Sequence, residues 1–132
     1  MEGTMPDSEL KRHHYPSLGD AVGPYVHATE HNGTLYTSGF TAFGTDAQHL
    51  GVGPQLKAIY SQLSAIAEHH QTTLDSIIKV TVYITDVADI PEARDALFEV
   101  YGKKYPASAM VQVAGLFHPD LKAEVEAIVS LT

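Results

Sequence analysis

The chain has no cysteine, few basic residues and no long apolar run. Without cysteine there is no disulfide, no thiolate nucleophile and no cysteine-bound zinc. Only 8 Lys and Arg stand against 16 Asp and Glu, giving a formal net charge of -8. That balance argues against a nucleic-acid partner, because phosphate binding relies on clustered basic side chains. No stretch could span a bilayer and residues 1–20 do not resemble a signal peptide, so we expect a cytoplasmic protein without a membrane partner.

What is present suffices for one domain. The chain has 132 residues, of which 44% are hydrophobic, so it can bury an ordinary core but has no room for a second domain. Residues 1–18 mix charges, prolines and histidines, which predicts a flexible arm or one that is ordered only by docking. Residues 19–132 are then a single domain.

Hydrophobic spacing predicts an α+β fold. Apolar residues recur every three or four positions in two segments and every second position in others. Asn32-Gly33 is a strong hairpin signal because both residues accept positive φ. The expected elements are strands at 25–30 and 34–38, a helix at 54–70, a strand at 78–85, a helix from Pro91, and strands at 107–115 and 121–131. This order predicts a mixed sheet with two helices on one face.

The second face of the sheet is expected to be half polar. In the last strand it carries Glu124, Glu126 and Ile128, and we place Ser108 and Met110 of the preceding strand on it by the same alternation. No third helix is predicted to cover this face. It is therefore either exposed to solvent or a subunit interface, and the interface is favoured.

Five segments, in this order, resemble motifs of the RidA (YjgF) family. They are Gly-Pro-Tyr at 23–25, Thr-Ser-Gly at 37–39, the strand at 79–86, the Pro-Ala segment within 105–116 and Glu-Val-Glu-Ala-Ile at 124–128. The resemblance covers nearly the whole chain from Gly23 to Leu131. It implies a chorismate-mutase-like subunit that assembles as a homotrimer, with a cleft between each pair of neighbouring subunits.

The resemblance also implies a chemistry and a set of site residues. Members of the family hydrolyse reactive enamines and imines, such as 2-aminoacrylate, to 2-keto acids and ammonia. Glu124 would position or activate the water. The residues implied to bind the small molecule are Tyr25, Ser38, Gly39, Phe40, Tyr83, Ser108 and Met110. Each also has an ordinary structural interpretation: Glu124 as a solvated or interface carboxylate, the tyrosines as packing residues, and Ser108 as a small residue in a tight interface.

Ser108 stands where the family carries the arginine that binds the substrate carboxylate. A hydroxyl brings no charge, so the bidentate contact is lost, at roughly 2–4 kcal/mol of affinity for an anionic substrate in a dry site. Phe40 and Met110 also depart from the family pattern and make the cleft more apolar. We therefore expect a small neutral or weakly polar ligand.

Histidines are abundant, with 8 in the chain. His27 lies two residues after Tyr25, and His118 precedes the strand of Glu124, so either could supply the missing positive charge when protonated. The paired histidines at 13–14 and 69–70 lack the His-Glu-x-x-His spacing of a metal helix, and we predict neither a metal nor a cofactor.

Three functions remain. The first is a RidA-like hydrolase that uses Glu124 and a water. The second is a non-catalytic trimer that binds a small molecule or regulates another process. The third is a ribonuclease or translation inhibitor, which the acidic charge and the lack of a basic aromatic groove disfavour.

Overall fold

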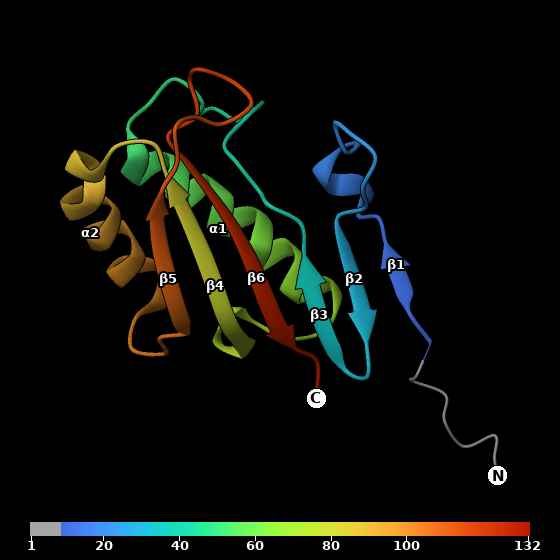
Figure 1. The fold of residues 1–132 in the computed structure, drawn as a ribbon. Coiled ribbons are helices and arrows are strands. Elements are labelled where there is room, and N and C mark those ends of the chain that lie inside the picture. Colours follow the sequence, from blue (N-terminus) through green and yellow to red (C-terminus); the bar gives the residue numbers. More distant parts are fainter. Residues whose placement is uncertain (1–8) are drawn as a thin grey trace, which may run out of the picture.

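The structure is a computed structural model that describes residues 9–132. One sheet with the strand order β1-β2-β3-β6-β4-β5 is covered on one face by two helices (Figure 1). The elements are β1 (Lys11–His13), β2 (Ala28–His31), β3 (Thr34–Thr37), α1 (Val52–His69), β4 (Ile77–Ile84), α2 (Ile90–Tyr101), β5 (Ala107–Gln112) and β6 (Ala123–Ser130). All neighbouring strands are antiparallel except β4 and β5, which are parallel. The predicted mixed α+β fold is confirmed.

The element boundaries follow local chemistry. Helix α1 begins at Val52, two residues before the expected start, because Pro54 fits in a first turn, where its missing N–H is not needed. Asn32 and Gly33 have φ of 52° and 78°, which confirms the predicted hairpin turn between β2 and β3. Strand β5 ends at Gln112 rather than near Gly115, because its last paired residue on β4 is Ile84.

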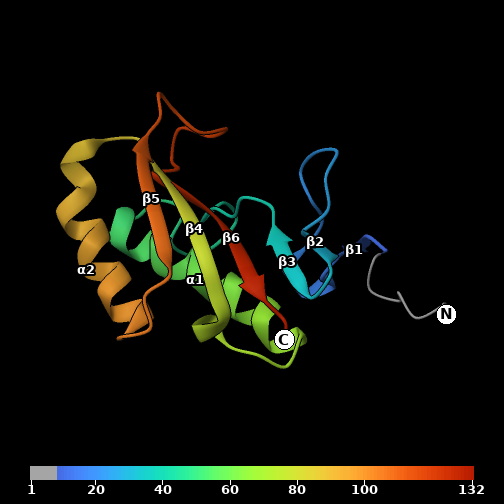
Figure 2. The ribbon, with the colours of Figure 1, turned by 60° about the horizontal axis from the view of Figure 1, so that its bottom comes forward.

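The core lies between β6 and the helices. Ala123, Val125, Ala127 and Val129 are at most 4% exposed, which confirms the predicted inward face of β6. Their alternation directs Glu124, Glu126 and Ile128 to the open face. Figure 2 shows α1 behind the sheet from a second direction. Within residues 9–132, neither helix is long and apolar enough to cross a membrane.

The position of β5 corrects one expectation. Ser108 and Met110 pair in parallel register with Val80 and Val82 of β4, whose side chains are buried beneath the helices. Residues paired in this way share a face of the sheet. Ser108 and Met110 therefore point to the side of α2 and not to the open face, and Ser108 remains exposed because β5 is the edge strand.

The chain before residue 19 is partly docked on the domain. Residues 1–8 of the expected arm lie outside the described residues. Strand β1 pairs with β2, with Lys11 opposite Glu30, and the Tyr15 ring is only 3% exposed. Strand β1 and Tyr15, which the sequence assigned to the arm, therefore pack on the domain. This agrees with the alternative in which the arm is ordered by docking.

Candidate functional site

A cleft of about 490 Å³ opens beside the carboxyl end of β3. Six of the residues singled out from the sequence line it: Tyr25, His27, Ser38, Gly39, Phe40 and Glu124. Leu18, Val22, Phe43 and Phe117 add apolar surface. No lysine or arginine of residues 9–132 is among its lining residues. This chain thus provides a mainly apolar cleft with two acidic side chains, Asp20 and Glu124, and no lysine or arginine among its described residues.

Glu124 lies directly against the backbone of Gly39. A Cβ atom built on Gly39 would overlap Oε2 of Glu124 and lie 2.7 Å from its Cδ. The arrangement is fixed by a two-way bridge next to it: Phe40 N donates to Val125 O at 2.9 Å, and Val125 N donates to Phe40 O at 3.1 Å. The absence of a side chain at Gly39 therefore lets the Glu124 carboxyl take this position, and a Cβ there would displace it.

The environment of Glu124 favours its protonated form. Burial is the main cause that raises the pKa of this carboxyl, and the neighbouring charge of Glu126 raises it further. A carboxyl with a raised pKa can donate and accept a proton nearer to neutral pH than an exposed glutamate. This is the property that proton transfer to and from a water would need.

Three other residues that the resemblance implies bind the ligand differ in their surroundings: Ser38, Tyr25 and Tyr83. The Ser38 hydroxyl donates to Val26 O at 2.6 Å, so its proton is used to join the segment after β3 to the segment before β2. Tyr25 is 45% exposed at the cleft. Tyr83 does not line the cleft, although it pairs with Glu124 across β4 and β6. Burial is the main cause that raises the pKa of Tyr83, and the charge of Glu126 and the hydrogen bond with Glu126 raise it further.

Ser108 and Met110 lie in a second pocket on the same subunit. This pocket, of about 430 Å³, lies between β5 and α2 and is also lined by Arg94, Phe98 and Tyr105. Strands β6 and β4 separate β5 from β3. Eight of the residues singled out from the sequence therefore line two separate pockets of one chain, whereas Tyr83 and His118 line neither. Arg94 is a cation in the pocket of Ser108 that sequence reasoning missed.

The structure argues against His27 as a source of positive charge. Its side chain is buried, 3% exposed, and its Nδ1 accepts a hydrogen bond from Tyr15 N at 2.9 Å. Burial, followed by the nearby His14, lowers the pKa of His27. The ring is therefore neutral at neutral pH and serves to hold the docked segment before residue 19.

His118 lies beside the cleft and not among its lining residues. Its Nδ1 accepts a hydrogen bond from Asp120 N at 3.1 Å, and its ring centroid is 5.4 Å from that of Phe43. A role for His118 as a charge substitute stays a prediction.

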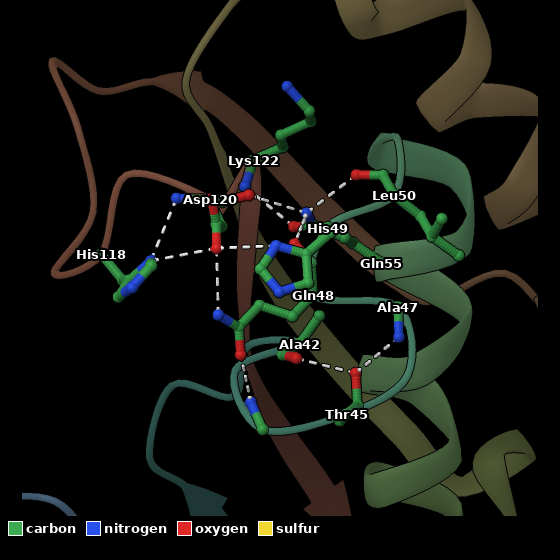
Figure 3. A network of polar contacts seen from close by, with 11 residues as sticks. Ala42, Thr45, Ala47, Gln48, His49, Leu50, Gln55, His118, Asp120 and Lys122 are labelled. Atoms are coloured by element: carbon green, nitrogen blue, oxygen red, sulfur yellow. Dashed lines mark hydrogen bonds and ion pairs between the residues drawn. The ribbon is translucent and has the colours of Figure 1, made fainter.

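A buried glutamine holds the two loops that flank the cleft (Figure 3). Nε2 of Gln55 donates to the carbonyl oxygens of Gln48, Leu50 and Asp120 at 3.0, 3.1 and 2.9 Å. Its Oε1 accepts from Lys122 N at 2.8 Å. One side chain, which is 0% exposed, therefore joins the loop before α1 to the loop before β6 with four hydrogen bonds.

Asp120 strengthens the same contact from the surface side. Its carboxylate accepts from Gln48 Nε2 at 3.0 Å and pairs with His49 at 3.0 Å. The hydrogen bond from Gln48 is the main cause that lowers the pKa of Asp120. The joined loops carry Phe43 and Phe117, whose rings meet edge to face at 5.2 Å. Both rings line the cleft, so the loop network shapes the apolar wall.

Comparison with known proteins identifies the family. A family model described as Endoribonuclease L-PSP matches residues 17–131. A RutC family protein of Aquifex aeolicus (strain VF5) is 34% identical over 113 residues, covering 84% of this chain and 90% of that protein. The chain belongs to the RidA (YjgF) family.

Two further RidA-family relatives extend this comparison. A 2-iminobutanoate/2-iminopropanoate deaminase of Dermatophagoides farinae is 26% identical over 117 residues, covering 86% of this chain and 91% of that protein. The crystal structure of E. coli TdcF with bound serine has a TM-score of 0.74 and 30% identity, covering 83% of this chain and 90% of that one. The fold expected from the resemblance is confirmed.

Adding a side chain at Gly39 should push Glu124 out of place. We expect Gly39→Ala to lower the free energy of unfolding by about 1–3 kcal/mol, because an overpacked site must move its neighbours. Urea denaturation measures the change. The control is Gly115→Ala, since a Cβ at Gly115 meets nothing within 4 Å. Equal stability of the two variants would contradict a tight contact between Gly39 and Glu124.

Removing the Gln55 amide should loosen both loops. We expect Gln55→Leu to reduce the free energy of unfolding by about 2–4 kcal/mol, because buried backbone groups lose their partners. Ser61→Leu, on the exposed side of α1, is the control and should change stability by less than about 0.5 kcal/mol. Chemical denaturation measures the free energy of unfolding of both variants. A Gln55→Leu variant as stable as the control would show that the network contributes little to stability.

The raised pKa of Glu124 predicts a pH-dependent cost of its charge. The folded state binds this proton more tightly than the unfolded state, so the carboxyl destabilises the fold progressively as pH rises from the unfolded pKa to the folded one. We expect Glu124→Gln to be more stable than the natural protein near pH 8 and similar near pH 4. Denaturation at both pH values tests this, with Glu68→Gln on the exposed end of α1 as the control. A difference that is independent of pH would contradict the assignment.

Proposed function

We propose that this RidA-family protein binds a small reactive enamine or imine in a cleft between subunits and hydrolyses it. The main support for this proposal is the environment of Glu124, a carboxyl of raised pKa that lies against Gly39 in a mainly apolar cleft. The name of the D. farinae relative, an imine deaminase, supports the reaction class. The serine bound to TdcF supports a small-molecule ligand.

The proposed reaction assigns one proton relay to Glu124. The protonated Glu124 first gives its proton to the carbon of the enamine, which becomes an iminium ion. Water then adds to the carbon of the C=N bond, and the Glu124 carboxylate accepts the proton that the water loses. Glu124 passes this proton to the nitrogen of the resulting carbinolamine; the C–N bond breaks as the C=O bond forms, ammonia departs, and the hydroxyl proton returns to Glu124. The apolar lining limits competing water around the reactive carbon.

The charges in the cleft bear on the substrate. Asp20 and Glu124 are acidic, His27 is held neutral, and no lysine or arginine of the described chain lines this cleft. A carboxylate placed here would be desolvated without a partner, which is unfavourable. We therefore propose a neutral or weakly polar substrate for this site.

A homotrimer would complete the site. Ser108 and Met110 lie on edge strand β5, away from Glu124 in the same chain. Packing the β5 edge of a neighbouring subunit against the cleft would bring Ser108 and Glu124 together, as the family resemblance implies. In that arrangement Arg94, which lines the pocket of Ser108, is the cation available to a ligand that carries a carboxylate.

Release of pyruvate and ammonia from 2-aminoacrylate, generated in situ, tests the proposal. We expect the natural protein to be close to the spontaneous rate and Ser108→Arg to be faster by roughly 30- to 1000-fold, the equivalent of about 2–4 kcal/mol of carboxylate binding. Ser108→Gln is the control, because it adds bulk without charge. Glu124→Gln in the Ser108→Arg background should abolish turnover.

Other outcomes separate the alternatives. Fast turnover by the natural protein would contradict the neutral-substrate proposal and make Arg94→Gln the next variant to test. Inactivity of every variant, with binding of serine retained, would favour a non-catalytic small-molecule-binding or regulatory trimer. Ribonuclease or translation-inhibitor activity receives no support from a net charge of -8.

A further inference from the structure

Two histidines and a glutamate meet beside the docked segment, outside the cleft. His13 comes from β1, Glu30 from β2, and His70 directly follows α1. No two of their candidate ligand atoms are more than 4.8 Å apart. Nε2 of His13 lies 2.8 Å from Oε1 of Glu30, and the rings of His13 and His70 meet edge to face with centroids 4.8 Å apart. All three residues are partly buried.

We propose that His13, Glu30 and His70 bind one divalent transition-metal ion, for which Zn²⁺ is the best match. Two imidazole nitrogens and one carboxylate oxygen are ligands typical of zinc, and a water completes a tetrahedral site. Magnesium and calcium fit poorly because they require mainly oxygen ligands.

The spacing allows such a site after small side-chain movements. Zinc bonds of about 2.0–2.2 Å place neighbouring tetrahedral ligands about 3.3–3.6 Å apart. The present separations run from 2.8 Å, between His13 and Glu30, to an upper limit of 4.8 Å. Rotation of side chains brings the ligands to this spacing while the strand pairing of β1 and β2 stays in place.

A neighbouring side chain would orient one of the proposed ligands. The Tyr15 hydroxyl, 2.8 Å from Nε2 of His70, orients that ring, as second-shell groups do for metal-bound histidines.

Such an ion would join three segments that are distant in sequence. It would hold β1 against β2 and the end of α1, and with them the chain that leads to Leu18 and Asp20 in the cleft wall. Because the site forms only in the folded protein, binding would stabilise the fold. This inference is independent of the proposed hydrolysis.

Calorimetric titration of the chelator-treated full chain with ZnCl₂ tests the proposal. We expect one Zn²⁺ per chain and a rise of several degrees in Tm at about 100 times the dissociation constant, with no rise for Mg²⁺. His13→Gln and His70→Gln should each weaken zinc binding by about 100-fold or more. His49→Gln, whose partner is Asp120, should bind zinc as the natural protein does. Far-ultraviolet circular dichroism confirms that each variant is folded.

Cobalt(II) provides an independent readout. Visible absorption of the Co²⁺-loaded protein reports low-coordinate ligation, and Glu30→Gln should change that spectrum while His49→Gln leaves it unchanged. Zinc binding that survives both His13→Gln and His70→Gln would overturn the proposal and place the ion on other histidines. Failure to bind at a tenfold molar excess of zinc would overturn it as well.

Discussion

The alternation of side chains along β6 is the constraint on which the site depends. Its small apolar residues pack beneath the helices, so Glu124 and Glu126 must point to the opposite face. The bridge between Phe40 and Val125 then places Gly39, in the segment after β3, against Glu124. Burial of the hydrophobic core thus sets both the position of the carboxyl and the surroundings that raise its pKa.

The cleft of this chain carries acidic and apolar groups but no lysine or arginine among the described residues. The cleft supplies a carboxyl of raised pKa and apolar walls, and Gln55 joins the loops that carry part of these walls. Ser108, which the family resemblance aligns with the usual arginine, lies on the far edge strand and lines the same pocket as Arg94. If subunits assemble as we propose, the ligand that this cleft accepts would depend on the charge that the edge strand of the neighbouring subunit brings.

Much of the fold could be predicted because it depends on local periodicity. The Asn32-Gly33 turn, the inward face of β6 and both helices follow from neighbouring residues. The docking of Tyr15, the neutral state of His27 and the meeting of His13 with His70 depend on contacts between distant segments, which spacing does not encode. Gln55 did carry a signal, since it is a polar residue on the apolar side of a helix. The face of Ser108 was predicted wrongly because alternation within one strand does not say which side the helices cover.

The contact between Gly39 and Glu124 couples the effects of substitutions at these two positions. A side chain at position 39 fits this backbone only if the Glu124 side chain moves from its present position or becomes shorter. Trimming Glu124 first meets no such obstacle, because it leaves Gly39 unstrained. The effects of the two substitutions are therefore non-additive, and a side chain at position 39 costs less stability once position 124 carries a shorter residue.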